Sequence, residues 1–223
     1  LVLPTIIEPL RNEWSSIQTA AFHLASVGKL EDAYQTVTEF HRNLCRTRVL
    51  DPACGSGNFL YVTMEHMKRL EGEVIDTVRK LGGGTLLQKS LDDNYTVSPA
   101  QFLGIELNRR AANLARLVLW IGYLQWHFRN NGPNTRVPEP VMQDIANIEC
   151  RDAILSYDDM VPVTDEAGRP LTRWNSSKFK PSPVTGKSIP DETERVVVEM
   201  PVNPRKAEWP KADFVVGNPP FLG

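Results

Sequence analysis

Short apolar runs alternate with longer helical patterns along most of this 223-residue chain. The helical patterns are regular at three- and four-residue steps, and each is preceded by a run short enough to be a strand. Such alternation is typical of a parallel sheet with helices on both faces, in which ligands bind at the carboxyl ends of the strands. The sequence therefore predicts an α/β core. The expected strands are 47–50, 101–107, 145–150 and 213–217, and the expected helices are 58–81 and 109–128.

Two segments stand outside this alternation. Residues 1–45 contain two amphipathic patterns, centred on 14–27 and 30–44, that predict packing helices in an N-terminal helical segment. Residues 46–223 are expected to form the main domain. Within it, residues 157–212 contain eight prolines and few apolar runs, so they predict an irregular insertion, with room for a hairpin, in place of a helix.

Composition sets broad limits on function. The apolar share of 41%, the charged share of 23% and the net charge of −2 are those of an ordinary globular protein, without a global attraction to nucleic acid. The three cysteines are far apart and form no C-x-x-C pair, so we expect neither disulfides nor a metal site, and a reducing cytoplasm. The longest apolar stretch, 117–124, is far shorter than the roughly 20 residues that span a bilayer, so no membrane association is expected.

A glycine-containing turn follows the first predicted strand. Asp51, Gly55 and Gly57 lie between that strand and the next helix, where glycines permit a tight turn and close approach of the backbone to a ligand. Leu60 stands where a dinucleotide fingerprint has its third glycine, and no Gly-Lys-Ser/Thr follows. A purely structural turn fits this local pattern equally well.

Single acidic residues follow the second and third predicted strands. Glu106 could accept hydrogen bonds from two vicinal ribose hydroxyls, and Asp152 could accept one from the amino group of an adenine ring. Either residue could instead cap a helix or lie in its first turn. The order of glycine turn, acid and acid after three successive strands is more specific than any one of them.

The fourth predicted strand is followed by Asn218, Pro219, Pro220 and Phe221. This sequence combines an amide oxygen, a stiff backbone with outward carbonyls and an aromatic face, which together suit binding the amino group of a planar base. A proline-rich turn that closes a strand is the alternative.

The insertion carries a basic stretch. Residues 168–190 contain five Lys or Arg and no acid, with two aromatic residues among them. Such a loop could contact a phosphate backbone or stack on bases, and a solvated loop is the alternative. The candidate contacts to DNA are Arg169, Arg173, Trp174, Lys178 and Lys180.

The motifs at 51–59, 104–108 and 217–221 together resemble those of methyltransferases that modify adenine N6 in DNA, in particular the methyltransferase region of type IIG/IIL restriction–modification enzymes. The resemblance covers residues 45–223, with weaker support from 111–125. It implies a Rossmann-like class I S-adenosylmethionine-dependent fold, truncated after its fourth strand. The interval between the first two motifs is long, so residues 80–100 look inserted.

The resemblance also implies roles for individual residues. S-adenosylmethionine would be held by Asp51, Ala53, Gly55, Gly57, Phe59, Glu106 and Asp152. The turn would hold its methionine portion, Glu106 the ribose and Asp152 the adenine amino group. The implied catalytic residues are Asn218, Pro219, Pro220 and Phe221, of which the first two would bind the target amine and the last would stack on the base.

The implied reaction is methyl transfer from S-adenosylmethionine to the N6 amine of an adenine that has flipped out of double-stranded DNA. Target-recognition and nuclease regions would lie outside this chain, and the setting would be a bacterial or archaeal cytoplasm. No Pro-Cys dipeptide occurs, which disfavours C5-cytosine chemistry. The alternatives are a methyltransferase acting on a protein glutamine or an RNA base, and an inactive cofactor-binding fragment.

Overall fold

The computed structural model describes residues 1–81, 96–131, 147–175 and 178–219. The chain divides into two compact units. The first unit comprises Leu1–Ala153 and Trp209–Gly223, and the second, here called the hairpin unit, is Ile154–Glu208. Most of the segment that looks inserted at 80–100 lies outside the described residues.

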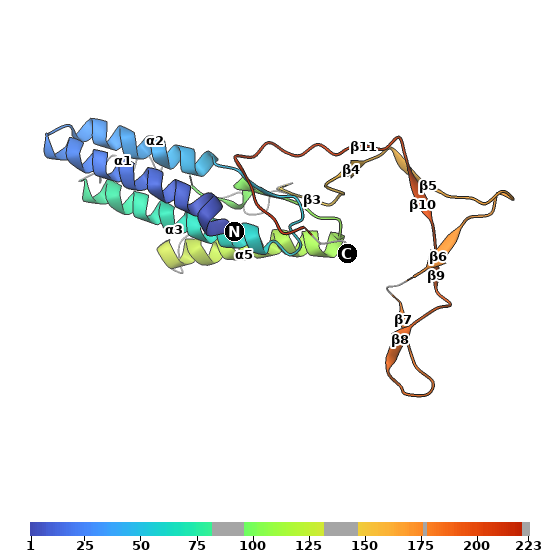
Figure 1. Cartoon of the computed structure of the whole chain (residues 1–223). Coiled ribbons are helices and arrows are strands. Elements are labelled where there is room, and N and C mark those ends of the chain that lie inside the picture. Colours follow the sequence, from blue (N-terminus) through green and yellow to red (C-terminus); the bar gives the residue numbers. More distant parts are fainter. Residues whose placement is uncertain (82–95, 132–146, 176–177, 220–223) are drawn as a thin grey trace. The chain divides into compact units, whose positions relative to one another are not determined.

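Most of the described residues of the first unit lie in helices. A short π-helix, η1 (Leu3–Ile7), leads into α1 (Glu8–Ser26), and α2 (Leu30–Arg46) returns beside it. The two long helices of the core are α3 (Asn58–Lys80) and α5 (Arg109–Asn131), and Figure 1 shows all four long helices side by side. The four helical patterns expected from the sequence are thus confirmed. Trp14 on α1 stacks on Phe40 of α2 with ring centroids 5.1 Å apart.

The predicted parallel sheet is confirmed. It contains β1 (Val49–Asp51), β2 (Phe102–Ile105), β3 (Ile148–Glu149) and β12 (Phe214–Val215) in the order β12-β1-β2-β3, and every pairing is parallel. A short 3-10 turn, η2 (Pro99–Gln101), precedes β2. The strands are shorter than the apolar runs that predict them. Because all four run the same way, their carboxyl ends lie at one edge.

The described helices cover one face of the sheet, where helices on both faces were expected. Val49, Phe102 and Ile148 belong to one core with α1, α2, α3 and α5, whereas Leu50, Leu103 and Ile105 form a separate cluster with Ala153 and Ala212. The reason is the direction of the crossovers. The connections from β1 to β2 and from β2 to β3 step the same way across the sheet, and right-handed crossovers then place both helices on one face. The connection from β3 to β12 reverses direction but carries the hairpin unit instead of a helix.

The hairpin unit is more regular than the predicted insertion at 157–212. Its strands pair in nested antiparallel order, from the two ends of the unit inward along the chain. The pairs are β4 (Leu155–Ser156) with β11 (Arg205–Lys206), β5 (Asp159–Pro162) with β10 (Glu199–Val202), β6 (Thr172–Trp174) with β9 (Arg195–Val197), and β7 (Phe179–Pro181) with β8 (Ser188–Pro190). Strands of two to four residues, several of them with proline, are too short to give a period-2 pattern, so the sequence did not reveal this ladder.

Candidate functional site

The carboxyl edge of the sheet gathers the acidic and amide residues that the sequence analysis selected. Asp51 is the last residue of β1, and Glu106 comes directly after β2. Asn218 follows β12 by three residues, and Asp152 follows β3 by three. The candidates from four distant parts of the sequence therefore lie at the same edge, as expected for a parallel sheet.

The turn after β1 needs its glycines. Gly55 and Gly57 have φ of +54° and +83°, a region in which residues with a Cβ are strained. A Cβ on Gly57 would also lie 3.1 Å from Cβ and 3.2 Å from Cα of Ala115, so α5 packs directly on the turn. The Cys54 N–H donates to the Ile105 carbonyl at 3.1 Å, which attaches the turn to β2. The backbone of the turn is therefore held in place by α5 on one side and by β2 on the other.

Glu106 joins this turn to the start of α5. Its Oε2 accepts a hydrogen bond from the Gly55 N–H at 2.9 Å, and its Oε1 accepts one from the Asn108 N–H at 2.7 Å. The helix cap is Asn108, whose Oδ1 accepts hydrogen bonds from the Arg110 and Ala111 N–H groups at 2.9 and 3.3 Å. Glu106 is therefore not the cap of α5. Since a carboxylate oxygen can accept two hydrogen bonds, Glu106 keeps acceptor capacity for a ligand.

Asp51 is a buried carboxylate with an incomplete set of partners. Its side chain is fully buried, and Oδ1 accepts a hydrogen bond from the Ala53 N–H at 3.0 Å. Its Oδ2 is buried and has no partner among the described residues. Burial, together with the negative charge of Glu106, raises the pKa of Asp51 to about 6, against the lowering effect of the Ala53 N–H. Such a group would gain a hydrogen bond from a cationic ligand donor at this edge.

The loop after β12 passes directly against Asp51. The Val216 N–H donates to the Leu50 carbonyl at 2.9 Å, and a Cβ on Gly217 would lie 2.7 Å from Asp51 Oδ1. Asn218 and Pro219 follow at once, and both are exposed. Pro220 and Phe221 lie outside the described residues. Asp51 is thus positioned between the glycine turn and the segment that carries Asn218.

Cys54 is not a nucleophile in this setting. Its side chain is buried, and burial, with the charges of Asp51 and Glu106, raises its pKa to about 12. Its Sγ lies where a Cβ on Gly104 would come within 2.7 Å. Cys54 therefore acts as a small residue that fills the space between the turn and β2.

Asp152 lies in the half-buried segment that leaves the sheet after β3. It starts no helix, because β4 is the next element along the chain. The alternative interpretation of this residue as a helix cap is therefore wrong. Trp209 Nε1–H donates to the Ala153 carbonyl at 2.7 Å, which joins the points where the chain leaves and re-enters the first unit.

Phe59 and Ala53 complete the residues expected at the turn. Phe59, in the first turn of α3, is partly buried and packs against the main hydrophobic core. Ala53 is partly buried, and its N–H is already used by Asp51. The seven expected cofactor-binding residues are therefore all described, and five of them, from Asp51 to Phe59, form one continuous segment.

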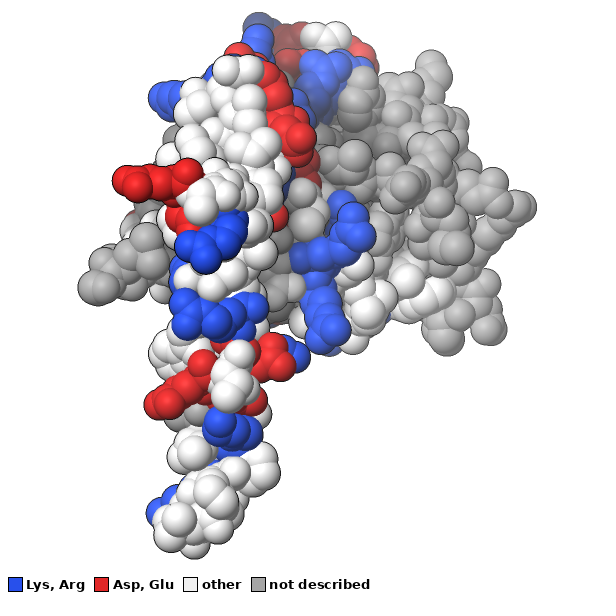
Figure 2. Space-filling view, turned by 90° about the vertical axis from the view of Figure 1, so that its right-hand side faces the viewer, with Lys and Arg blue, Asp and Glu red and all other residues white. Residues whose placement is uncertain are grey.

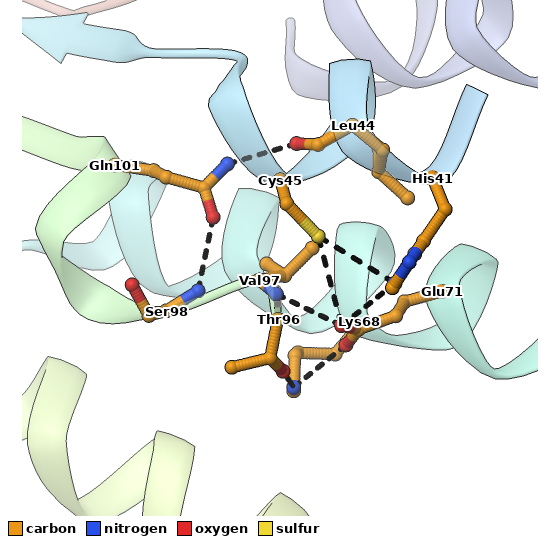
Figure 3. Close-up of polar contacts among 9 residues, drawn as sticks. All are labelled: His41, Leu44, Cys45, Lys68, Glu71, Thr96, Val97, Ser98 and Gln101. Carbon is orange, nitrogen blue, oxygen red and sulfur yellow. Dashed lines mark hydrogen bonds and ion pairs between the residues drawn. The ribbon is translucent and has the colours of Figure 1, made fainter. Parts of the chain in front are cut away.

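A second polar cluster, which the sequence analysis missed, lies among the helices (Figure 3). Buried Glu71 on α3 accepts from Lys68 Nζ at 2.7 Å and from the Val97 N–H at 2.9 Å, and its Oε1 lies 3.4 Å from His41 Nε2. Burial opposes ionisation, but these hydrogen bonds and the charge of Lys68 hold the pKa of Glu71 below its ordinary value. The visible signal was a Lys and a Glu three residues apart on the apolar face of a helix.

This cluster ties α2, α3 and the segment before β2 together. The donor atoms of His41, Cys45 and Glu71 lie within 4.8 Å of one another, a spacing that one metal ion could bridge. However, the Lys68 ammonium group already balances the charge of the Glu71 carboxylate, and the Val97 N–H donates a second hydrogen bond to it. The carboxylate therefore needs no metal ion to neutralise it. We assign the cluster a structural role.

The candidate DNA-contacting residues all belong to the hairpin unit. Figure 2 shows Lys and Arg side chains spaced along this unit with Asp and Glu among them. Arg169 pairs with Asp165 at 2.9 Å, and Lys180 pairs with Asp191 at 3.1 Å. Trp174 Nε1–H donates to the Asp191 carbonyl at 2.8 Å and its ring is exposed. Arg173 and Lys178 are exposed.

No described helix is long and apolar enough to cross a membrane.

Comparison with known proteins gives one family and two individual matches. Residues 27–223 match the family model described as MmeI, DNA-methyltransferase domain. DNA methyltransferase A of Bacillus subtilis (strain 168) is 34% identical over 128 residues, which are 55% of this chain and 14% of that protein. A solved structure of the type IIL restriction–modification enzyme MmeI in complex with DNA matches at 24% identity and a TM-score of 0.49, over 66% of this chain and 18% of that one. The chain thus spans a small part of the length of both proteins.

Proposed function

Because this chain belongs to the MmeI DNA-methyltransferase domain family, we propose that it transfers a methyl group from S-adenosylmethionine to the N6 amine of an adenine in double-stranded DNA. The enzyme would be part of a restriction–modification system in a bacterial or archaeal cytoplasm. Target-recognition and nuclease regions would lie outside this chain. The sheet would be part of a Rossmann-like class I architecture, with residues 1–45 as an accessory helical segment and 46–223 as the methyltransferase domain.

One observation carries the proposal. The four parallel strands deliver Asp51, Glu106 and Asn218 to the same edge, and Gly217 brings the segment of Asn218 against the Asp51 side chain. A methyl donor at the glycine turn would therefore adjoin the group proposed to bind the methyl acceptor. Proximity of this kind is a large part of the catalysis of group transfer.

The residues at the turn fit a cationic cofactor. Asp51 has a buried oxygen in need of a donor, and Glu106 adds a second carboxylate beside the Gly55 N–H. We propose that Asp51 and the backbone of Ala53, Gly55 and Gly57 hold the methionine portion, with Phe59 packed beside it. Glu106 would bind the ribose hydroxyls and Asp152 the adenine amino group. S-adenosylmethionine supplies a methyl group on a positively charged sulfur, which is already a strong methyl donor.

The residues of the protein would act chiefly on the nitrogen that accepts the methyl group. An aromatic amine shares its lone pair with the ring, so it is a weak nucleophile. We propose that the Asn218 side-chain oxygen and the Pro219 carbonyl accept hydrogen bonds from its two N–H groups and stabilise the positive charge that develops on nitrogen. Pro220 would keep this backbone rigid, and Phe221 would stack on the flipped base. Arg169, Arg173, Trp174, Lys178 and Lys180 are proposed contacts to the DNA.

The decisive experiment uses the intact protein that carries this chain, labelled S-adenosylmethionine and plasmid DNA. After digestion to nucleosides, we expect the label in N6-methyladenine. Label in protein or RNA would favour the alternative methyltransferases, and no label despite cofactor binding would favour an inactive cofactor-binding module.

A pair of asparagine variants distinguishes a specific role of Asn218 in methyl transfer from a general effect of replacing an exposed asparagine. The Asn218→Ala variant should lose transfer and retain cofactor binding, whereas Asn12→Ala, an exposed position on α1, should change neither.

A further inference from the structure

Strands β7 and β8 of the hairpin unit form an antiparallel hairpin (Figure 1). Lys180 lies opposite Ile189, with Phe179 opposite Pro190 and Pro181 opposite Ser188. Two backbone hydrogen bonds extend this register at both ends: the Asp191 N–H donates to the Lys178 carbonyl at 2.9 Å, and the Ser182 N–H donates to the Lys187 carbonyl at 2.8 Å. The ladder therefore runs from 178 to 182 on one strand and from 187 to 191 on the other.

This register sorts the side chains onto two faces. Residues alternate along a strand, and residues opposite one another in an antiparallel pair share a face. Lys178 and Lys180 therefore lie on the same face, together with Lys187 from the other strand. Phe179, Pro181 and Ser188 lie on the opposite face. We call the three lysines the lysine face of the hairpin.

The lysine face carries a local positive charge. Lys178 and Lys187 are exposed, and no described carboxylate lies within ion-pair distance of either. Lys180 pairs with Asp191 at 3.1 Å, and this acid lies on the same face, so the net charge of the face is about two. A strand rises about 3.3 Å per residue, which separates Lys178 from Lys180 by about 7 Å. The cations are thus spread along the ribbon.

The rest of the hairpin suits contact with a large partner. Phe179 is 58% exposed and Val184, in the turn at the tip, is 90% exposed. The turn itself is ordered by its own hydrogen bonds, since the Gly186 N–H donates to the Ser182 carbonyl at 2.9 Å and Gly186 has a φ of +66°. A two-stranded β-ribbon is also narrow enough to enter the major groove of DNA.

We propose that the lysine face, Lys178, Lys180 and Lys187, binds the phosphate backbone of double-stranded DNA without reading its sequence. The inference rests on the proposed function, because that function supplies the polyanion. It goes further in naming Lys187 and in assigning the contact to one face of one hairpin. Lysine ammonium groups on flexible stems bind phosphates as point charges, so the contact positions the duplex and leaves base recognition to other parts of the protein.

The test measures the salt dependence of DNA binding by the intact protein. Fluorescence anisotropy of a labelled duplex gives the association constant at a series of salt concentrations. Each lost phosphate contact makes the plot of log K against log salt less steep by about 0.9. The triple variant K178Q/K180Q/K187Q should therefore reduce the slope by about 1.8, which corresponds to two contacts because Asp191 offsets one of the three charges. Between 50 and 200 mM salt the wild-type protein would then lose about 12-fold more affinity than the variant.

Two matched variants accompany it. K29Q/R69Q/K80Q removes the same charge from exposed positions on or beside the helices of the first unit and should leave the slope unchanged. K178R/K180R/K187R keeps the charge of the lysine face and should keep the wild-type slope. The proposal is overturned if the glutamine variant of the lysine face keeps the wild-type slope. It is also overturned if the slope of the first-unit variant falls by as much as that of the lysine-face variant.

Other outcomes also count against it. A slope that also falls in the arginine variant would indicate a structural role for the lysines. A slope that depends on the lysines with double-stranded RNA but not with DNA would identify RNA as the partner. Failure of the proposed function is a separate result. It would appear as absence of N6-methyladenine at low salt from a protein whose lysine-dependent DNA binding is intact.

Discussion

Replacing Asp51 by asparagine should change how the stability of the protein depends on pH. The raised pKa means that the folded protein holds this proton more tightly than the unfolded chain. Between pH 3.8 and about 6 the folded state therefore binds more protons, and stability falls as the pH rises through this window. At about 1.4 kcal/mol per pKa unit, the shift corresponds to about 3 kcal/mol of destabilisation at neutral pH.

The Asp51→Asn variant removes this ionisation but can keep the hydrogen bond from the Ala53 N–H. We expect it to be more stable than the wild-type protein at pH 7 by up to about 3 kcal/mol, and to lose this advantage near pH 4. The same change should weaken cofactor binding, because it removes the proposed anionic partner. A residue that lowers stability and serves a ligand is a common compromise at functional sites.

Denaturant unfolding at a series of pH values is the appropriate assay. Helical circular dichroism reports on the first unit, because the described part of the hairpin unit contains strands and no helix. As a control, Asp76→Asn changes an exposed carboxylate on α3 and should alter stability by less than about 0.5 kcal/mol. A difference between wild type and Asp51→Asn that stays constant from pH 4 to 7 would refute the reasoning.

Three further changes test the geometry of the site. Glu106→Ala should weaken cofactor binding, because it removes an acceptor and frees the Gly55 N–H; an unchanged dissociation constant in calorimetry would contradict this role. Asn218→Ala should leave that constant nearly unchanged while methyl transfer is lost, and equal loss of both would refute the assignment to the acceptor amine. Gly57→Ala should lower stability by about 1–3 kcal/mol, because φ is +83° and the new methyl group would press on α5. Gly72→Ala, with open space around it on α3, should instead raise stability by about 0.5–1 kcal/mol; similar denaturation midpoints for the two alanine variants would argue against the packing account.

Local sequence patterns were enough to identify the parallel sheet and the position of its motifs. Each strand is an apolar run followed at once by a glycine, acid or amide motif, and parallel topology then puts these motifs at one edge. The expectation that Asp51, Glu106 and Asn218 come together follows from connectivity, and the structure has them at that edge. Their roles toward cofactor and base remain predictions.

Tertiary structure decided the features that depend on which distant segments become neighbours. Gly217 and Asp51 meet because β12 pairs with β1, and the lysine face exists because the register of β7 and β8 aligns its cations. The hydrogen bond from the Val97 N–H to Glu71, and the position of His41 Nε2 beside the same carboxylate, likewise depend on how α2, α3 and the segment before β2 pack. Sequence periodicity specifies the kind of each element and the face it buries, whereas register and packing partners are chosen by the chain as a whole, through contacts that no local pattern encodes.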